Sequence, residues 1–564
     1  MNHPIIPIAV LDASRQRKRQ GPKGRRVDPG ALADVQRLLG DASRQSDLLI
    51  EHLHKIQDHL GHLPASHLAA LAQEMRLAQT EVYEVASFYH HFDVVKEGEA
   101  APAPLTVRVC DGLSCEMAGA GELLAKLPAL LGRGVRVIAA PCIGRCEQAP
   151  AVVVGQNPVS NASCERVAAA VKAGAVKHLP EGFIDYEAYE AAGGYALLRQ
   201  CVAGERDVEA VIKTMEDSGL RGLGGAGFPA GRKWRIVKAE AGPRLMAVNI
   251  DEGEPGTFKD RVLLERDPHR FLEGMLIAAW VVGIEKIYIY LRDEYHGCRE
   301  MLEAELARLR AAPPVSGIPP IELRRGAGAY ICGEESAMIE SIEGKRGMPR
   351  LRPPYVAQIG LFGRPTLEHN FETLYWVREL LEQGGGWFGS HGRNGRKGLR
   401  SFSVSGRVKN PGVKLAPAGI TIQELIDEHC GGMLDGQTFY GYLPGGASGG
   451  ILPATMNAIP LDFDTLQPYG CFIGSAAVIV LSDRDTATAA ARNMMRFFHH
   501  ESCGQCTPCR VGTAKASHLM AQPRWDLPLL ADLSQVMRDA SICGLGQAAP
   551  NPLDCVVKYF PQEL

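Results

Sequence analysis

Three closely spaced cysteines near the end of the chain, with a fourth further on, have the type and spacing of iron–sulfur ligands. Two residues separate Cys503 from Cys506 and Cys506 from Cys509, and Cys543 follows much later. Thiolate is the ligand that iron–sulfur centres prefer, and three thiolates this close together can bind three corners of a cube. The spacing therefore predicts a [4Fe–4S] cluster, with a zinc site as the alternative.

A second group of cysteines falls at the ends of predicted β-strands. Alternating apolar residues predict strands over 105–110, 135–138 and 151–154. The four cysteines are Cys110, Cys115, Cys142 and Cys146. Thiolates on two loops at strand ends can hold a [2Fe–2S] cluster. A structural zinc site, which more often uses closely spaced cysteine pairs, and a disulfide pair are the alternatives.

The glycine-rich segment 221–234 has the composition of a phosphate-binding loop. Its notable residues are Gly222, Gly224, Gly225, Gly227, Phe228 and Lys233. Glycine adopts positive φ at little cost and lets backbone N–H groups approach a phosphate. The lysine would add a positive charge and the phenyl ring a flat apolar face. Because the spacing matches neither a Walker loop nor a dinucleotide fingerprint, a tight turn is the alternative to a nucleotide cradle.

Two further loops in the same part of the chain carry carboxylates. An acidic segment over 251–261 follows a predicted strand at 245–249, and a second glycine-rich turn, 326–335, ends in Glu334 and Glu335. A single carboxylate pair is usually the solvated start of a helix. Two glycine-rich loops and two acidic loops in one stretch favour a shared binding site.

The elements that must position these loops alternate between helix and strand. A βαβ-like unit is predicted from a helix over 208–218, the strand at 245–249, a helix over 271–282 and a strand over 286–291. Residues 400–463 are rich in predicted strand. Helices over 493–500 and 511–519 would flank the C-terminal cysteines.

The residues from about 28 to 93 are predicted to form a helical unit. One helical stripe consists of Leu49, Leu53, Ile56, Leu60 and Leu63. Seven histidines lie in this unit, at positions 52, 54, 59, 62, 67, 90 and 91. No carboxylate or cysteine lies among them at a familiar metal-binding spacing, so we expect surface or capping roles.

Length and composition restrict the class of protein. The 564 residues suffice for three or four domains of about 150 residues, and 46% hydrophobic with 22% charged residues is typical of a soluble globular protein. A net charge of −3 gives no argument for nucleic-acid binding, and no apolar run approaches the roughly 18 residues of a membrane span. The N-terminus does not have the pattern of a secretory signal, so we expect a cytoplasmic protein whose fifteen cysteines are not a disulfide framework. The basic run from Arg15 to Arg26 is expected to be a mobile, solvated arm, with docking on a partner subunit as the alternative.

Several short motifs in the first third of the chain occur together in a known family. They are Leu53-x2-Ile56-Gln57, Gly61-x-Leu63-Pro64, the segment 82–89 and the four cysteines from Cys110 to Cys146. Together they resemble the small [2Fe–2S] subunit of respiratory complex I. The likeness covers about residues 35–175 and implies a helical bundle followed by a thioredoxin-like [2Fe–2S] domain.

The chain from about Gly204 to Leu564 carries a second, highly specific set of motifs. They are the glycine-rich segment 221–234, the acidic loop 251–261, the turn 326–335 and the C-terminal cysteines. These resemble the flavoprotein subunit of complex I and its relatives. The resemblance implies a Rossmann-like domain for FMN and NAD(H), a small β-grasp domain and a helical [4Fe–4S] domain. We expect the β-grasp domain to be a rigid spacer, with ligand binding as the alternative.

The same resemblance implies roles for individual residues. The FMN phosphate and ribityl chain would be cradled by Gly222, Gly224, Gly225, Gly227 and Lys233. The polar edges of the flavin would be held by Asn249, Asp251 and Asn370, with Tyr330 and Gly333 beside it. Phe228 and Tyr355 would stack on NADH, and its ribose and nicotinamide ends would contact Glu254, Glu334 and Glu335. Two positions depart from the commoner pattern and each affects one flavin contact: Leu223 stands where arginine is frequent, and His369 where a second asparagine usually precedes Asn370.

We therefore predict a multidomain α/β protein. Its segments would be a basic flexible arm (1–34), a helical bundle (35–98), a thioredoxin-like [2Fe–2S] domain (99–180), an FMN/NAD(H)-binding domain (181–395), a β-grasp domain (396–484) and a helical [4Fe–4S] domain (485–564). FMN explains why nucleotide and cluster motifs share one chain, because nicotinamide exchanges two electrons as a hydride and a cluster exchanges one at a time. Electrons from a partner subunit would pass through [4Fe–4S] to FMN and then as hydride to NAD⁺. No residue is required as a general acid or nucleophile, although Glu334 would lie near the hydride transfer.

The identity of the partner rests on the layout of the chain. No segment resembles a pterin-binding or nickel-binding domain, so we expect another subunit to handle the oxidisable substrate. Fusion of two complex I-like modules is typical of formate dehydrogenases and of NAD-reducing hydrogenases. The sequence of residues 222–234 is most similar to that of formate dehydrogenase β subunits. This similarity predicts a catalytic α subunit with a molybdenum or tungsten pterin centre and further Fe–S clusters. The alternatives are the diaphorase subunit of a hydrogenase, a complex I-type NADH dehydrogenase module and, in a different class, a non-catalytic electron-relay scaffold.

Overall fold

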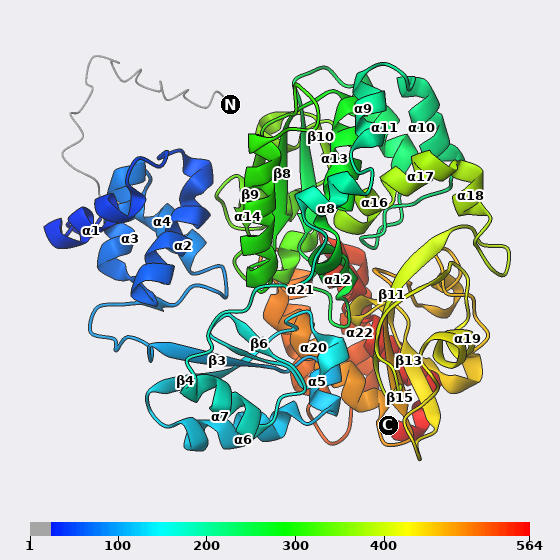
Figure 1. The fold of residues 1–564 in the computed structure, drawn as a ribbon. Coiled ribbons are helices and arrows are strands. Elements are labelled where there is room, and N and C mark those ends of the chain that lie inside the picture. The colour runs from blue at the N-terminus through cyan, green and yellow to red at the C-terminus, as the bar shows by residue number, and fades with distance from the viewer. Residues whose placement is uncertain (1–23) are drawn as a thin grey trace, which may run out of the picture.

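Helices and sheets follow one another along the chain as successive units, which Figure 1 shows from blue to red. The computed structural model describes residues 24–564, so the basic run before Gly24 lies outside the described residues. Arg25 is described, and its backbone N–H donates to Gln79 Oε1 at 2.7 Å.

The first unit, called here the helical unit, contains four helices and one short sheet. The helices are α1 (Pro29–Leu39), α2 (Leu49–Leu60), α3 (Ala65–Met75) and α4 (Gln79–Ala86), and the parallel strands are β1 (Leu63–Pro64) and β2 (Val94–Val95). The Asp28 side chain accepts from the backbone N–H of Ala31 at 2.8 Å, and Pro29 occupies the first helical position. The segment 1–34, predicted to be a flexible arm, therefore ends in helix, because these two residues start α1. Gly61 ends α2 with a φ of 77°.

The prediction for the histidines is wrong at two positions. His52 and His54 are buried, with exposed fractions of 1% and 3%. Their Nε2 atoms lie 2.8 Å from the Ser43 carbonyl oxygen and 2.9 Å from that of Gly326. His54 is covered because the helical unit packs against a second domain, to which Gly326 belongs, whereas His52 is covered by the segment around Ser43 within the helical unit itself.

The next unit, the mixed-sheet domain, contains the four cysteines from Cys110 to Cys146. Its elements are β3 (Leu105–Cys110), α5 (Leu113–Met117), α6 (Ala120–Leu131), β4 (Val135–Ala140), β5 (Val152–Val154), β6 (Asn157–Val159) and α7 (Cys164–Lys172). The strand order is β4-β3-β5-β6. The β3–β4 pair is parallel, whereas β3–β5 and β5–β6 are antiparallel.

The third unit, the parallel-sheet domain, has the four strands β7 (Arg244–Ile250), β8 (Ile284–Leu291), β9 (Ile321–Arg325) and β10 (Thr366–Asn370). Its helices are α8 (Tyr186–Ala191), α9 (Ala196–Val202), α10 (Val208–Asp217), α11 (Ala230–Ala239), α12 (Lys259–Arg266), α13 (Pro268–Val282), α14 (His296–Ala311), α15 (Glu335–Ile342), α16 (Phe371–Tyr375), α17 (Val377–Gln383) and α18 (Gly385–Gly389). The strand order is β10-β7-β8-β9 and every pair is parallel. Apolar runs such as Leu245–Val248 are buried, as expected for a parallel sheet covered on both faces.

The helical unit covers the edge of this sheet. Arg324, in the edge strand β9, places its Nη2 atom 2.7 Å from Asp47 Oδ2. Arg325 Nη1 lies 2.6 Å from Asp58 Oδ2. An edge strand that is covered in this way cannot pair with another chain.

Two further units complete the chain. The five-stranded domain contains β11 (Leu399–Gly406), β12 (Gly412–Pro417), α19 (Ile422–Glu424), β13 (Phe439–Leu443), β14 (Leu452–Pro453) and β15 (Ala477–Ser482), in the order β12-β11-β15-β13-β14. The C-terminal helices are α20 (Ala487–Glu501), α21 (Thr507–Met520), α22 (Leu527–Ala540), α23 (Gly544–Ala548) and α24 (Asn551–Tyr559). The predicted helices 493–500 and 511–519 lie within α20 and α21.

Candidate functional site

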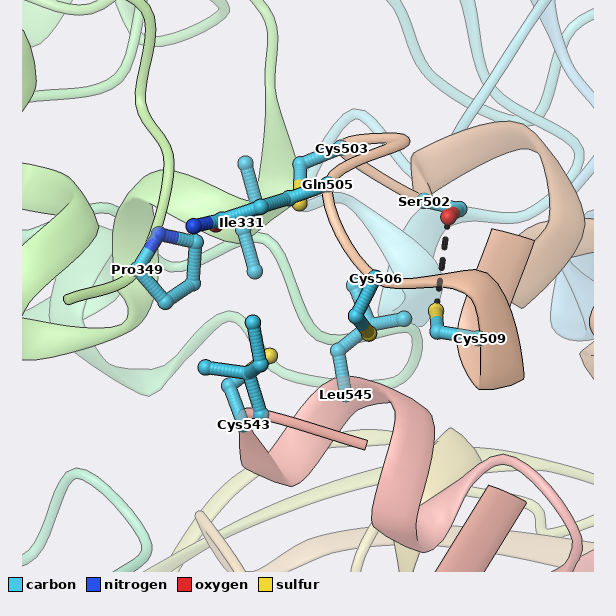
Figure 2. A pocket seen from close by; sticks show the side chains of 10 residues that line it. Ile331, Pro349, Ser502, Cys503, Gln505, Cys506, Cys509, Cys543 and Leu545 are labelled. Atoms are coloured by element: carbon cyan, nitrogen blue, oxygen red, sulfur yellow. Dashed lines mark hydrogen bonds between the residues drawn. The ribbon is translucent and has the colours of Figure 1, made fainter. Parts of the chain in front are cut away.

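The C-terminal cysteines come together around one small cavity. Figure 2 shows Cys503, Cys506 and Cys509 on the loop before α21 and its first turn, with Cys543 opposite them at the start of α23. All four line this cavity. The Ser502 hydroxyl lies 3.3 Å from Cys509 Sγ (Figure 2). The structure therefore gathers four thiols whose widest step along the chain, from Cys509 to Cys543, is 34 residues.

The donor set of this cavity fits an iron–sulfur cluster. None of the fifteen cysteines is in a disulfide, so all four thiols are free to bind metal. Burial raises the pKa of Cys509 to about 11 and that of Cys543 to about 12. Neutral thiols would therefore persist at pH 7 unless a cation stabilised the thiolates, which is what a cluster does.

The four cysteines from Cys110 to Cys146 are also brought together. Cys110 ends β3 and pairs in register with Ala140 at the end of the parallel strand β4, so the loops that follow both strands meet at one edge of the sheet. Cys142 Sγ lies 3.3 Å from Cys146 Sγ. A Cβ atom on Gly112 would lie 3.5 Å from Cys110 Sγ and 3.6 Å from Cys142 Cβ, so the backbone of Gly112 lies directly beside these cysteines. With Cys115, the thiols are almost completely buried, and four such ligands fit a [2Fe–2S] cluster.

The loop that carries Cys142 and Cys146 is held by the parallel-sheet domain. Arg292 Nη2 donates to the Cys142 carbonyl oxygen at 2.7 Å, and Arg261 Nε donates to that of Gly144 at 2.9 Å. Both arginines are buried. Arg292 also donates to the Glu252 carbonyl oxygen, so one guanidinium joins the cysteine loop to the acidic loop 251–261.

A large cavity lies at the carboxyl ends of the parallel strands. Its volume is about 1280 Å³, above the 300–1,000 Å³ of a typical single-ligand pocket, so it has room for two adjacent ligands. Every residue that the resemblance implies for FMN and NAD(H) lines it, namely Gly222, Gly224, Gly225, Gly227, Phe228, Lys233, Asn249, Asp251, Glu254, Tyr330, Gly333, Glu334, Glu335, Tyr355 and Asn370. The structure thus brings together residues from segments as far apart as 222 and 370.

The glycine-rich segment folds as a closed loop between α10 and α11. The Gly222 N–H donates to the Phe228 carbonyl oxygen at 2.8 Å and closes the loop on itself. Gly225 and Gly227 have φ values of 127° and 67°, which other residues rarely adopt. A Cβ on Gly224 would lie 3.0 Å from Asn370 Cβ. These glycines let the backbone approach both the neighbouring strand end and the cavity.

The two asparagines lie side by side but use their amides within the protein. Asn249 and Asn370 pair in register at the ends of β7 and β10. Asn249 Nδ2 donates to the Gly333 carbonyl oxygen at 2.9 Å. Asn370 caps α16, because its Oδ1 accepts from the N–H of Glu372 at 3.0 Å, and its Nδ2 donates to Asp260 at 2.7 Å. Both side chains therefore hold the cavity wall in place, and their predicted flavin contacts stay predictions.

Asp251 has the environment expected of a ligand-contacting group. Its Oδ2 atom is buried and has no hydrogen-bond partner among the described residues. Burial raises the pKa of this carboxyl group well above its usual range, although Arg292 opposes the shift. Buried carboxyl oxygens normally have partners, so an unpartnered carboxyl group in the cavity wall is consistent with a bound polar group nearby. Because Oδ2 itself has almost no accessible surface, the predicted flavin contact of Asp251 stays a prediction.

The charged residues near the glycine loop are paired. Lys233 Nζ lies 3.0 Å from Glu368 Oε2, so part of its charge is balanced before any phosphate binds. Glu334 caps α15: its Oε2 accepts from Ser336 N–H at 3.0 Å and Ala337 N–H at 2.9 Å. Glu335 Oε1 lies 2.9 Å from Arg352 Nη2, which also pairs with Glu334.

The five-stranded domain contributes to the cavity, which favours a part in ligand binding in addition to the expected role as a rigid spacer. Glu254 Oε1 accepts from Ser448 N–H at 2.8 Å and from its hydroxyl at 2.7 Å, and Glu254 Oε2 accepts from Tyr330 Oη. Ser448 and Phe472 line the cavity. The glycine-rich run 441–450 was the signal for this loop, but no local pattern showed which domain it would contact.

Sequence reasoning also missed a buried lysine in the wall. Lys259 is 1% exposed, and its Nζ lies 2.7 Å from Asp260 Oδ1 and 2.9 Å from Glu372 Oε2. Lys259 and Asp260 line the cavity. The acidic loop 251–261 therefore brings a positive charge as well as negative ones.

The two positions that depart from the commoner pattern are buried and satisfied. The Leu223 N–H donates to Thr373 Oγ1 at 2.9 Å. His369 Nε2 accepts from Trp234 Nε1–H at 2.8 Å. Burial and the nearby Lys233 lower the pKa of His369 well below its usual range, so this residue is a neutral imidazole with its proton on Nδ1.

The two cavities at the C-terminal helices share a wall. Ile331, Ile542, Cys543 and Leu545 line both the small cysteine cavity and the large cavity. A cofactor in the large cavity and a cluster on the four cysteines would therefore be neighbours. Among residues 24–564, no helix combines the length and the apolar character needed to cross a membrane.

Four protein families match successive parts of the chain. Residues 35–175 match the thioredoxin-like [2Fe–2S] ferredoxin family, and residues 215–379 match the Nuo51 FMN-binding domain. Residues 401–452 match the SLBB domain, and residues 489–564 match the NADH-ubiquinone oxidoreductase-F iron–sulfur binding region. The predicted fold class and the predicted FMN, [2Fe–2S] and [4Fe–4S] cofactors are confirmed.

Similar proteins include both respiratory subunits and a hydrogenase. The chain is 40% identical over 399 residues to F subunit 2 of the NADH-quinone oxidoreductase of Rhizobium meliloti, a match that covers 68% of this chain and 94% of that protein. It is also 40% identical over 373 residues to the mitochondrial NADH dehydrogenase flavoprotein 1 of Dictyostelium discoideum, covering 63% and 78% of the two chains. A solved NAD⁺-reducing [NiFe]-hydrogenase in the H2-reduced state superposes with a TM-score of 0.82 at 34% identity, covering 92% of this chain and 93% of that one.

Proposed function

The chain belongs to the family of FMN-binding F subunits of NADH-quinone oxidoreductases, and we propose that it is the NAD-reducing electron-transfer subunit of a formate dehydrogenase. As a member of that family it is an oxidoreductase subunit with FMN and iron–sulfur centres. The observation that carries the proposed electron path is the shared wall between the large cavity and the C-terminal cysteines, with Cys543 in both.

The residues of the chain would hold the cofactors rather than take part as acids or nucleophiles. FMN supplies the exchange between a two-electron hydride and single electrons when it is bound. The glycine loop with Lys233 would hold its phosphate, and Asp251 in the cavity wall would lie beside its ring. Phe228 and Tyr355 are 39% and 56% exposed at the cavity, where they would stack on the nicotinamide nucleotide. The side chains of Glu254 and Tyr330, bonded to each other and to Ser448, would form the wall on the side of the five-stranded domain.

The formate dehydrogenase proposal rests on the glycine loop and on the fusion of the two modules. The sequence of residues 222–234 is most similar to that of formate dehydrogenase β subunits, and the [2Fe–2S] module precedes the flavin module in one chain. In this proposal a partner with a molybdenum or tungsten pterin centre oxidises formate. Its electrons reach the [4Fe–4S] cluster and leave as a hydride on NAD⁺.

A second candidate is the diaphorase subunit of an NAD-reducing hydrogenase. The superposition on the hydrogenase, which covers 92% of this chain, favours it. In that case every cofactor residue keeps its place and only the partner changes.

Metal analysis of the native complex, purified through this chain, tests the proposal together with assays of formate-driven and hydrogen-driven NAD⁺ reduction. Molybdenum or tungsten with formate activity is the expected result. Nickel with hydrogen activity would replace the formate dehydrogenase proposal by the hydrogenase one. A complex that has no FMN and does not oxidise NADH with ferricyanide would instead make the chain a non-catalytic relay.

A further inference from the structure

Three metal-binding side chains of the helical unit meet where it packs on the parallel-sheet domain. His54 and Asp58 are one turn apart on α2, and His91 lies beyond the end of α4. One ligand atom from each of the three lies within 4.8 Å of the others. The His54–Asp58 spacing of four residues places both on one face of the helix, a pattern that the sequence analysis did not recognise.

Each histidine offers a lone pair that no residue between 24 and 564 uses. His54 Nε2 lies 2.9 Å from the Gly326 carbonyl oxygen, which can only accept, so the proton must be on Nε2 and the lone pair on Nδ1. His91 Nδ1 lies 2.6 Å from Asp293 Oδ2, which likewise assigns the free lone pair to Nε2. Both His54 Nδ1 and His91 Nε2 are buried and have no hydrogen-bond partner among the described residues.

This is the arrangement that metal-bound histidines adopt. A ligating imidazole almost always donates its second N–H to a backbone carbonyl or a carboxylate, which sets its tautomer and its orientation. His54 has the carbonyl of Gly326 in that place, and His91 has the carboxylate of Asp293.

Asp58 can add an oxygen without losing its anchor. Its Oδ2 lies 2.6 Å from Arg325 Nη1, whereas Oδ1 lies 3.4 Å from Nη2 and is only weakly held. The Arg325 guanidinium also contacts Asp293 Oδ1 at 2.6 Å. These two carboxylates and one guanidinium carry a net charge of −1, which favours a divalent cation.

We propose that His54, Asp58 and His91 bind a zinc ion at the junction of the helical unit and the parallel-sheet domain. Two imidazoles and one carboxylate are a known zinc ligand set, with a fourth position open to water. Zinc–ligand distances of about 2.0–2.1 Å place tetrahedral ligands roughly 3.4 Å apart. The three ligand atoms now lie within 4.8 Å of one another, so they would move closer together on binding the ion.

The ion would fix one domain on the other. All three ligands belong to the helical unit, whereas the groups that orient them, Asp293, Arg325 and Gly326, follow or end β8 and β9. The His91 N–H also donates to the Ala327 carbonyl oxygen at 3.1 Å. Residues 326–329 lead directly to Tyr330 in the large cavity, so the zinc site would hold the loop that carries this cavity residue.

Zinc content of the intact holoprotein tests the proposal. The protein is purified with its FMN and clusters from zinc-supplemented medium and dialysed against EDTA, and zinc, iron and FMN are then measured by elemental analysis and absorbance. The expected result is about one zinc per FMN in the wild type. We expect at least a tenfold loss of zinc in His54→Gln and in Asp58→Asn, with unchanged iron and FMN. His59→Gln, on an exposed residue of the same helix, should retain zinc.

Zinc X-ray absorption distinguishes this site from zinc misplaced on the cysteines. Nitrogen and oxygen ligands at about 2.0–2.1 Å support the proposal, and sulfur ligands at about 2.3 Å would overturn it. Absence of zinc from the wild type would also overturn it, as would zinc that is retained in both site variants. Asp58 is half-exposed, so Asp58→Asn is expected to fold. This variant therefore keeps the test decisive even if His54→Gln does not fold.

Discussion

Replacement of Glu334 separates a structural role at the flavin cavity from a direct contact with the nicotinamide. The resemblance implies that this carboxylate contacts NADH, yet the structure commits both of its oxygens. Oε2 accepts from Ser336 N–H, Ser336 Oγ and Ala337 N–H at 3.0, 2.6 and 2.9 Å, and Oε1 pairs with Arg352. We therefore expect Glu334 to act on the nicotinamide by fixing the first turn of α15 and not by contact.

The size of the effect follows from the capping contacts. Removing an N-cap side chain costs about 0.5–2 kcal/mol. The loss of Arg352 as a partner adds little, because Arg352 is 40% exposed and keeps Glu335 at 2.9 Å. In Glu334→Ala, binding of NADH would have to restore the turn, so about 1–2 kcal/mol is lost, which is roughly a 5- to 30-fold decrease in kcat/KM.

Glu334→Gln is the matched variant, because its amide oxygen can still accept from the two backbone N–H groups. We expect kcat/KM for NADH, measured with ferricyanide as acceptor, to stay within about threefold of the wild type in Glu334→Gln and to fall 5- to 30-fold in Glu334→Ala. FMN content should be unchanged in both. If the glutamine variant is as impaired as the alanine variant, the carboxylate itself contacts the nucleotide and the capping argument is refuted.

Three further predictions concern the cluster, the glycine loop and a buried carboxyl group. Cys543→Ser should remove the [4Fe–4S] EPR signal and leave the [2Fe–2S] signal; an unchanged spectrum would show that Cys543 is no ligand. Gly227→Ala should lower FMN content, because its φ of 67° costs about 1–2 kcal/mol for alanine and the new Cβ would lie 2.7 Å from the Phe463 ring. The control is Gly121→Ala, in open space on a helix, and equal FMN content in both variants would contradict the reasoning. Burial, followed by repulsion from a neighbouring carboxylate, raises the pKa of Glu252 from 4.5 to about 7, so the stability it contributes is present below pH 4.5 and is lost as the pH rises through 7. The melting temperature of the wild type relative to Glu252→Gln should therefore decrease from pH 5 to pH 8, and a constant difference would rule out this assignment.

Much of the cofactor inventory could be predicted from local patterns. The steps between Cys503, Cys506 and Cys509 are set by one loop and one helical turn, so their spacing indicates a cluster before any fold is known. The glycine loop is equally local, because glycine adopts the positive φ values seen at Gly225 and Gly227 without the steric cost that other residues would meet. The family resemblance then indicated which loops would line one cavity, and all fifteen residues do so.

Other features depend on contacts between segments far apart in the chain. Ser448 reaches Glu254 across 194 residues, and Trp234 reaches His369 across 135. No periodicity or motif encodes such pairs, because they arise only when elements far apart in the chain pack together and each buried polar atom must find a partner.

The sequence by itself determined which cofactors this chain can hold, because thiolate spacing and glycine backbones are local properties. Only the tertiary structure decided how individual side chains are used. Glu334 and Asn370 lie in the predicted cavity but cap helices, and His54 was expected at the surface but is buried against Gly326. The physical reason is that a side chain's role depends on which polar groups lie within hydrogen-bond distance, and that is settled by the packing of whole elements.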